Sequence, residues 1–519
     1  MDSIYTFSAL QPIWPELFMA FMVLGLLLIG VFKGHQSTRL LTFLAIGGLL
    51  FVAFLLLQTP TSKEPLLHGK IVIDLFAVNM KLIFITALIA SYLLSIKYLY
   101  DTGFVKFEYP VLIMMAGIGM FFMVSSHHML ATYMALELQA FSLYILAAFN
   151  RDSLKSAEAG IKYFILGAVS SGFILFGVSL LYGFTGHLNY SEMADVVSGL
   201  TGPERTGAVF GMMFVLSGVA FKIAAVPFHM WIPDVYEGAP IPVTAFFALV
   251  SKLAAIALLF RLLLGPFETL VADWQIAIAF LSVMSMTWAA FAGLVQNNLK
   301  RLMAYSSIGN IGYALLGIVT LTSQGFSATL FYLILYMVMT AGVFGVLLCM
   351  QRDGVVLRHL EDLAGMSKNH PVLAYAMAIL MFSMSALPPF SGFFGKLVIF
   401  QEVIAQELYM LAVIGVVSSV IATYYYLRVV KVMFFDEPDM PYTGGFGPFR
   451  SFVITASVLF AVFYILFPDS LMPFTQRTVN DLLPHGVEPI ELIKSSIEAE
   501  QGSLPSFQEL MKNAFPVER

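Results

Sequence analysis

The sequence predicts an all-α polytopic membrane protein with about fourteen transmembrane helices. Of the 519 residues, 59% are hydrophobic and only 11% are charged, whereas soluble domains carry about a quarter charged residues. Apolar runs of about 20 residues, the length that crosses a bilayer as a helix, follow one another along the chain. These runs are continuous, whereas the strands of a membrane barrel would alternate polar and apolar residues over about ten positions. The composition therefore requires a lipid bilayer around most of the chain.

The composition also excludes several kinds of site. A single cysteine, Cys349, rules out a disulfide framework, a thiolate-bound iron–sulfur cluster and a zinc site built on several cysteines. The net charge of −5 gives no basic surface for nucleic acid. No dinucleotide fingerprint follows a strand, and Lys396 lacks the flanking residues of a phosphate-binding loop. We therefore expect no cofactor and no metal in this chain.

The expected spans are similar in length, except for an overlong twelfth. Their approximate ranges are 16–33, 39–57, 75–97, 109–126, 128–149, 160–184, 208–232, 240–264, 274–296, 302–322, 326–350, 371–405, 408–434 and 450–468. On one side the connections hold fourteen Lys and Arg residues, and on the other side they hold four. Because positive residues are retained in the cytoplasm, both termini are predicted on the outer, periplasmic side of a bacterial inner membrane.

Proline interrupts two of these spans, at Pro227 in the seventh and at Pro388 and Pro389 in the twelfth. Proline removes a backbone donor, so the freed carbonyl groups need partners in protein or internal water. The broken spans are five apart, so a repeat with this spacing places its second copy upside down, as in many transporters. Two kinked packing helices are the alternative. The predicted parts are an N-terminal three-helix segment at 1–108, a first five-helix repeat at 109–265, an inverted repeat at 273–435, and a last span with a polar tail at 450–519.

Four ionisable side chains lie well inside apolar spans, where each costs about 2.5–3.5 kcal/mol to insert. These candidates for a proton relay are Glu137 in the fifth span, Lys222 in the seventh, Lys252 in the eighth and Lys396 in the twelfth. Desolvation favours release of a proton from lysine and a nearby carboxylate opposes it, so a hydrated chain of such groups can pass protons. A buried ion pair that only holds two helices together is the alternative for Glu137 and Lys222.

Other polar residues near the spans are weaker candidates. Lys162 lies near the inner end of the sixth span, where its side chain could also reach the interface. His229 could gate proton exit or bond a carbonyl freed by the break, and Lys300 could point inward or anchor the tenth span. Asp234 and Glu237 follow the seventh span and are expected to cap a helix or contact a neighbour rather than carry protons.

The tail at 469–519 is polar and acidic. It contains Ser506 followed three residues later by Glu509, a capping-box pattern that predicts a short helix. A solvated tail and a helix that docks on a neighbouring subunit both remain open.

Three sequence blocks, at 228–245, 299–308 and 388–396, resemble the antiporter-like membrane subunits of respiratory complex I, the NADH:quinone oxidoreductase. Within that family the chain is most similar to subunit N, since Lys396 is lysine rather than glutamate and the long lateral helix of subunit L is missing. Similar signatures occur in subunits of multisubunit cation/proton antiporters. The resemblance covers roughly residues 75–435 and has specific motifs in the expected order.

The resemblance implies a role for each candidate. Glu137 would pair with Lys222, Lys252 would be the central lysine, Lys396 would lead to the exit half, and Lys162 would modulate the pair.

The chain departs from the family pattern in its tenth span. Many members carry histidine where this chain has Gly309 and Asn310. Asn310 cannot bind a proton near neutral pH, so the relay there would need water or Lys300.

The family's activity follows as an implication. The chain would be a proton-translocating subunit of an oxidoreductase, driven by quinone reduction in other subunits. Those partner subunits would hold NADH, FMN, iron–sulfur clusters and quinone, and would include homologous antiporter-like chains. A subunit of a cation/proton antiporter and a non-conducting membrane scaffold are the alternatives.

Overall fold

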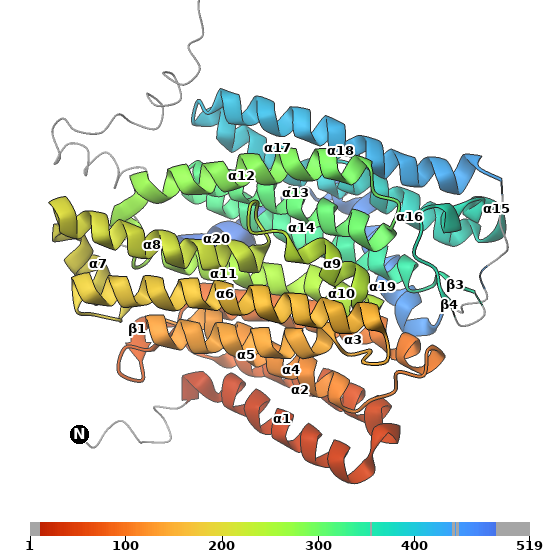
Figure 1. Cartoon of the computed structure of the whole chain (residues 1–519), viewed down its shortest axis with the longest axis horizontal. Helices are drawn as coiled ribbons and strands as arrows, with labels where there is room; N and C mark the ends of the chain where they lie inside the picture. The colour runs from red at the N-terminus through yellow and green to blue at the C-terminus, as the bar shows by residue number, and fades with distance from the viewer. Residues whose placement is uncertain (1–10, 353–354, 438–441, 443–445, 484–519) are drawn as a thin grey trace, which may run out of the picture.

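Long helices lie side by side along one axis of the molecule (Figure 1). The computed structural model describes residues 11–352, 355–437, 442 and 446–483. Thirteen helical segments in this part of the chain are long and apolar enough to cross a membrane. Their helices are α1 (Trp14–Lys33), α2 (Thr38–Gln58), α3 (Leu75–Asp101), α4 (Glu108–Ser125), α5 (Met129–Ala147), α6 (Leu154–Thr185), α8 (Gly202–Ile223), α10 and α11 (Ile241–Phe246 and Lys252–Leu263), α12 (Val271–Leu294), α13 (Leu299–Val319), α14 (Ser323–Leu347), α18 (Tyr409–Phe435) and α19 (Pro448–Phe463).

Shorter elements connect these helices or lie at their ends. They are β1 (Ser62–Leu66), β2 (Ile71–Ile73), α7 (Tyr190–Gly199), α9 (Trp231–Gly238), β3 (Gln351–Arg352), β4 (Val355–Val356), α15 (Met366–Asn369), α16 (Pro371–Met384), α17 (Ser391–Ala405) and α20 (Met472–Leu482). Each strand pair forms a small antiparallel hairpin. We call the end of the bundle with α7 and β1 the α7 end, and the opposite end the α15 end (Figure 1).

The expected seventh and twelfth spans are not continuous helices. In place of the overlong twelfth span stand two helices, α16 of 14 residues and α17 of 15 residues. The helix of the seventh span, α8, ends at Ile223 instead of reaching 232, and the chain continues as α9. In each break an alanine with positive φ, Ala224 or Ala386, follows the helix. The next backbone N–H then donates to the carbonyl five residues earlier, over 2.9 Å in the first break and 3.1 Å in the second.

A second feature also occurs twice. An isolated antiparallel bridge joins His128 to Asn189, and another joins Asn298 to His359, each residue 170 positions after its counterpart. The side chains of His128 and Asn298 also cap the helices that follow them, α5 and α13. The first bridge adjoins α7 and the second lies between β4 and α15, so they occur at opposite ends of the bundle (Figure 1).

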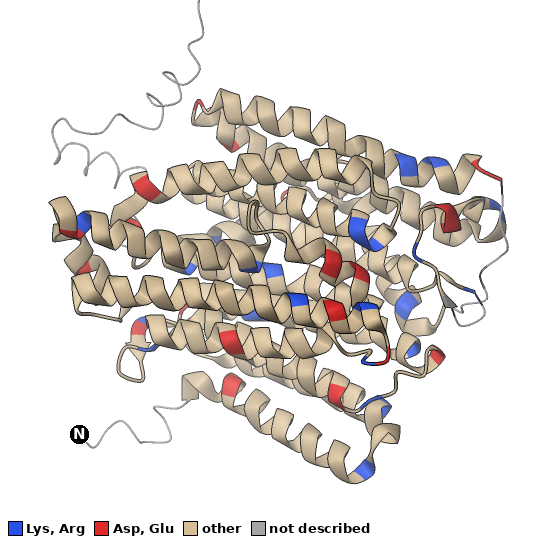
Figure 2. Cartoon of the chain, in the orientation of Figure 1, with Lys and Arg blue, Asp and Glu red and all other residues tan. Residues whose placement is uncertain are grey.

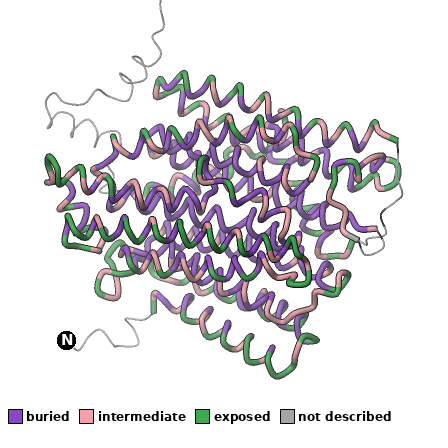
Figure 3. Tube along the Cα trace, viewed as in Figure 1, coloured by how far each residue is buried: buried purple, intermediate pink, exposed green. Residues whose placement is uncertain are grey.

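Burial is greatest in the centre of the bundle, and the outer helices expose much of their surface (Figure 3). Every residue of α11 is buried, and so are nearly all residues of α13. Most charged residues lie near the ends of the helices, while a few lie between the ends (Figure 2). The central helices are thus surrounded by other helices, and polar side chains on them face protein rather than lipid.

The last described helix, α20, packs against the start of α3. The backbone N–H of Leu75 donates to Asp481 over 2.8 Å, and Asn79 donates to Thr478 over 2.8 Å. The predicted capping box at Ser506 and Glu509 lies outside the described residues.

Candidate functional site

In the first half of the bundle, Tyr144 shares helix α5 with Glu137 and contacts Lys222. Helix α5 carries Glu137 and, two turns later, Tyr144, while Ser171 of α6 donates a hydrogen bond to Glu137 Oε1. In the last turn of α8, Lys222 Nζ donates to the Tyr144 hydroxyl over 3.4 Å and lies 5.8 Å from the centre of its ring. Among the described residues no carboxylate forms an ion pair with Lys222 within 4.0 Å, although the charge of Glu137 acts on it. The acid and the base are therefore near one another but not in contact.

Lys252 lies at the centre of the bundle and is 2% exposed. It is the first residue of α11 and follows a π-helical turn at Phe247–Ser251, a deviation that is frequent at functional sites. Its Nζ donates to Ser307 of α13 and lies 5.8 Å from the ring centre of Tyr236. The hydroxyls of Tyr236 and Tyr336 are buried beside the Ser307 hydroxyl. Lys252 thus adjoins a cluster of buried hydroxyl groups carried by α9, α13 and α14.

In the second half, neutral groups surround Lys396. The residue lies on α17, soon after the second break, and is 5% exposed. Its Nζ donates to Ser419 of α18 over 2.8 Å and lies 4.2 Å from the ring centre of Tyr313, close enough for a cation–π interaction. In the described part of the chain no acidic side chain pairs with Lys396.

Asn310 is the centre of a hydrogen-bond network next to Lys396. It accepts a hydrogen bond from Tyr332 over 2.6 Å and donates one to Ser306 over 3.3 Å. Ser306 in turn bonds the hydroxyl of Tyr426 over 2.6 Å. A cavity of about 10 Å³ is lined by Asn310, Ser306, Tyr426 and Lys396, among others, and this volume has room for about one water molecule.

Adjacent serines on α13 connect the two lysine sites. Ser307 accepts the hydrogen bond from Lys252, and Ser306 belongs to the network that borders Lys396. Sequence reasoning did not single out these serines or their tyrosine neighbours. Two consecutive serines in the middle of an apolar span were the available signal.

Lys300 and His229 lie near the breaks and ends of the central helices. Lys300 points inward, because it is 2% exposed and its Nζ donates to the carbonyl of Ala239 over 2.7 Å. His229 is buried in the first break, and its ring packs edge-on against Trp288 with 5.9 Å between the ring centres.

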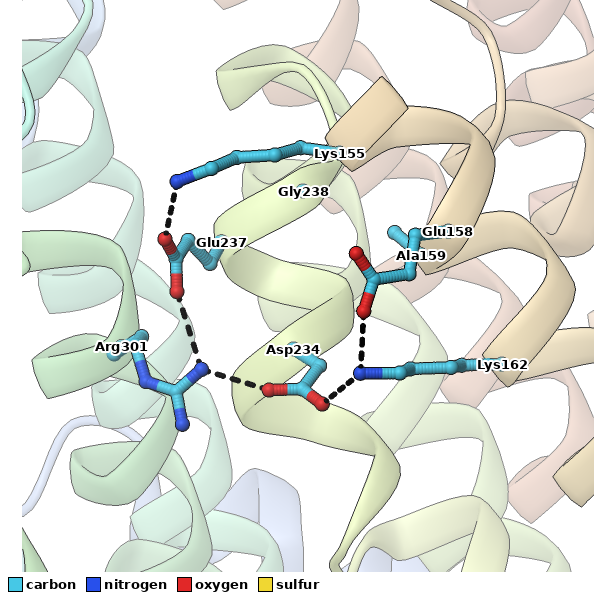
Figure 4. A pocket seen from close by; sticks show the side chains of 8 residues that line it. All are labelled: Lys155, Glu158, Ala159, Lys162, Asp234, Glu237, Gly238 and Arg301. Atoms are coloured by element: carbon cyan, nitrogen blue, oxygen red, sulfur yellow. Dashed lines mark hydrogen bonds and ion pairs between the residues drawn. The ribbon is translucent and has the colours of Figure 1, made fainter. Parts of the chain in front are cut away.

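A charged pocket of about 230 Å³ lies between α6, α9 and α13 at the α15 end (Figure 4). Its charged lining residues are Lys155, Glu158, Lys162, Asp234, Glu237 and Arg301. Lys162 donates to Asp234 over 2.7 Å, and the Lys162 side chain is 41% exposed. Lys162 therefore faces this pocket, and among the described residues no hydrogen bond or ion pair joins it to Glu137 or Lys222.

Arg301 joins the two halves of the bundle in this pocket. From α13 it donates to Asp234 over 2.7 Å and to Glu237 over 3.1 Å, both on α9 (Figure 4). Burial alone would raise the pKa of Asp234, but hydrogen bonds from Lys162 and Arg301 hold that pKa below its ordinary value. The pKa of Glu237 is lowered in the same way by Lys155 and Arg301, against the effect of burial. Asp234 and Glu237 thus contact neighbouring helices, as the sequence predicts.

Comparisons with known proteins show the family of this chain. Residues 126–422 match the family described as NADH:quinone oxidoreductase/Mrp antiporter, transmembrane. NADH-quinone oxidoreductase subunit N of Parvibaculum lavamentivorans is 44% identical over 93% of this chain and 100% of its own length. Subunit N 1 of Rhizobium meliloti is 46% identical over 88% of this chain and 95% of its own length.

Solved structures show the same fold. A chain of respiratory complex I from Thermus thermophilus with bound aureothin superposes with a TM-score of 0.73 and 30% identity, over 88% of this chain and 98% of that one. A chain of the Mrp complex from Dietzia has a TM-score of 0.80 but only 20% identity, over 93% of this chain and 99% of that one, and so it shows the fold alone. The identities to curated relatives, over nearly their whole lengths, show that this chain belongs to the NADH-quinone oxidoreductase subunit N family.

Proposed function

We propose that this chain is the proton-translocating membrane-arm subunit N of an NADH:quinone oxidoreductase. Protons pass along Glu137, Lys222, Lys252 and Lys396, and quinone reduction in other subunits drives the transfer. The observation that carries the proposal is the burial of Lys252 and Lys396 in the centre of a membrane bundle, next to hydroxyl groups and breaks in the helices. Such placement is costly and is typical of ion and proton pathways.

The contacts of the lysines support conduction over a purely structural role. Among the described residues neither Lys252 nor Lys396 forms an ion pair. Each instead donates to one serine, Ser307 or Ser419, and hydroxyl groups can pass a proton onward. The cavity lined by Asn310 and Lys396 has room for a water molecule. Such a water molecule would take the place of the histidine that many family members carry here. A scaffold that only fastens helices would gain more from a direct ion pair.

The repeated features support the inverted arrangement of 109–265 and 273–435. The two bridges at opposite ends and the two matching breaks are what an upside-down second copy would produce. The connections at the α15 end carry most of the Lys and Arg residues. We therefore assign that end to the cytoplasm of a bacterial cell and both termini to the periplasmic side.

The partner assignment follows from the relatives. Homologous antiporter-like chains and other membrane-arm subunits would adjoin this chain, and NADH, FMN, iron–sulfur clusters and quinone would be bound in partner subunits. In this chain the proposed task is proton transfer alone.

Replacement of Glu137 by Gln and of Lys222 by Met tests the proposal in the assembled complex. We expect each variant to assemble and to reduce quinone-linked proton pumping by about tenfold or more, because a group that carries the proton is lost. The measurements are proton uptake by membrane vesicles that oxidise NADH and the amount of assembled complex.

Lys97→Met is the matched control, since Lys97 is partly exposed and pairs with Asp101 on the same helix. It should assemble and pump like the parent. Full pumping by both Glu137→Gln and Lys222→Met would show that these residues only fasten helices.

A further inference from the structure

A buried ion pair lies in the N-terminal segment, apart from the proposed relay. Lys81 of α3 donates to Glu16 Oε1 in the first turn of α1, and their side chains are 0% and 1% exposed. The second carboxylate oxygen, Glu16 Oε2, is also buried and has no hydrogen-bond partner among the described residues. A carboxylate that is enclosed by protein in a membrane bundle and only half satisfied is costly. Its retention therefore calls for a reason other than packing.

A second buried pair nearby has a different construction. Asp74 binds Arg261 through both carboxylate oxygens and also caps α3 by accepting from Ala77 N over 2.8 Å. Arg261 also donates to the carbonyl of Val124 over 2.8 Å. Nearly all hydrogen-bonding capacity of this pair is used, as expected for a structural contact. Glu16, with one free oxygen, can accept a proton without breaking a second bond.

The Glu16–Lys81 pair lies near the α7 end of the bundle. Glu16 is the third residue of α1, and Lys81 lies about 9 Å along α3 from its first residue at 1.5 Å per residue. The two pairs are neighbours on α3, because Asp74 caps this helix and Lys81 follows Asp74 by seven residues, about two turns. Arg261 belongs to α11, the helix that begins with Lys252. A series of buried charges thus connects the N-terminal segment to the helix of the central lysine.

We propose that Glu16 and Lys81 form a second proton-binding site, which exchanges protons with the aqueous side at the α7 end; this inference rests on the proposed function. Glu16 takes a proton from water to become a carboxylic acid, and the Lys81 ammonium group loses its counter-charge. Lys81 then attracts Asp74 more strongly and weakens the hold of Asp74 on Arg261. Release of the proton from Glu16 restores the first state. Occupancy of this site therefore changes the field at α11 and at the relay.

Charge-free variants separate this role from a structural one. Lys81→Met alone leaves Glu16 buried without its partner, so we expect less assembled complex. The double variant Glu16→Gln with Lys81→Met removes both charges, so assembly should recover. Proton pumping per electron in the double variant should nevertheless fall by about twofold or more, with NADH oxidation by an artificial acceptor unchanged. Glu16→Asp keeps a carboxyl group at a changed distance, and we expect it to assemble and to shift the pH profile of pumping.

The outcomes are distinct. The second site would be overturned if the double variant pumped like the parent with an unchanged pH profile. If the double variant does not assemble, the same result in Glu16→Asp would overturn it. Lys222→Met serves as the reference in the same membranes. If it pumps normally, the proposed relay fails; if it is impaired and the Glu16 variants are normal, only the second site fails.

Discussion

The two halves of the bundle stabilise the lysines inside their helices by different means. In the half from α4 to α11, Lys222 contacts Tyr144, and the charge of Glu137, on the same helix as Tyr144, acts on it. In the half from α12 to α18, Lys396 contacts Ser419 and the face of the Tyr313 ring. No acidic side chain among the described residues pairs with it. The first lysine thus depends on charge at a distance and the second on the geometry of neutral dipoles. The proposed relay would therefore contain two lysine sites with different sensitivities.

Lys252 belongs to α11 of the first half and contacts Ser307 of the second half, so its loss should have the largest effect. We expect Lys252→Met to reduce NADH-driven proton uptake by about tenfold or more, because no other described amine contacts Ser307. Proton uptake by vesicles is the measurement, and NADH oxidation by an artificial acceptor reports on assembly. Near-normal uptake would show that each half conducts without the central lysine.

A matched pair of serine variants compares the two halves directly. Ser419→Ala removes the hydrogen bond that Lys396 donates, and Ser171→Ala removes the one that Glu137 accepts. A hydrogen bond to a charged group contributes about 1.5–3 kcal/mol, so Ser419→Ala should slow pumping about tenfold. Ser171→Ala should slow it less, because Glu137 keeps its attraction to Lys222. Equal effects on the pumping rate would contradict the difference between the halves.

Much of the fold and part of the site could be predicted from the sequence. The lengths of the apolar runs predict the spans, and the prolines at positions 227, 388 and 389 predict where two spans are interrupted. Both features depend on local chemistry. Hydrophobicity also identified Lys252 and Lys396, which the structure buries.

The remaining features depend on which helices meet, and local patterns do not carry that information. The sequence left open whether Lys162 is buried or reaches the interface, and only the fold shows that it pairs with Asp234 and Glu158 in the charged pocket. Tyr144 and Ser307 resemble ordinary residues of an apolar helix until their partners are known. Glu16 and Lys81 are 65 positions apart, so no local pattern pairs them.

Two tyrosine variants should differ in their effect on the stability of the complex. Tyr332→Phe removes the hydroxyl that donates to Asn310 and leaves a buried amide oxygen unsatisfied, at a cost of about 1–3 kcal/mol. Tyr144→Phe removes only a long 3.4 Å contact with Lys222, so it should affect stability little. The temperature of irreversible inactivation of the solubilised complex should therefore fall for Tyr332→Phe and change little for Tyr144→Phe. The reverse order would show that Tyr144 is the stronger contact.

The smallest effect is expected for Arg301→Met, which removes the contact between the halves at the α15 end. The Arg301 and Asp234 side chains are 29% and 36% exposed, so solvent screening limits the pair to about 1 kcal/mol or less. Because the pKa of folded Asp234 is lowered, the stabilisation is present above the ordinary carboxyl pKa of about 4 and is lost as pH falls through the lowered value. The parent should therefore exceed Arg301→Met in thermal stability at neutral pH, and the difference should shrink in high salt and disappear in strong acid. A difference that persists in acid would assign the role of Arg301 to packing of its side chain against α9 rather than to charge.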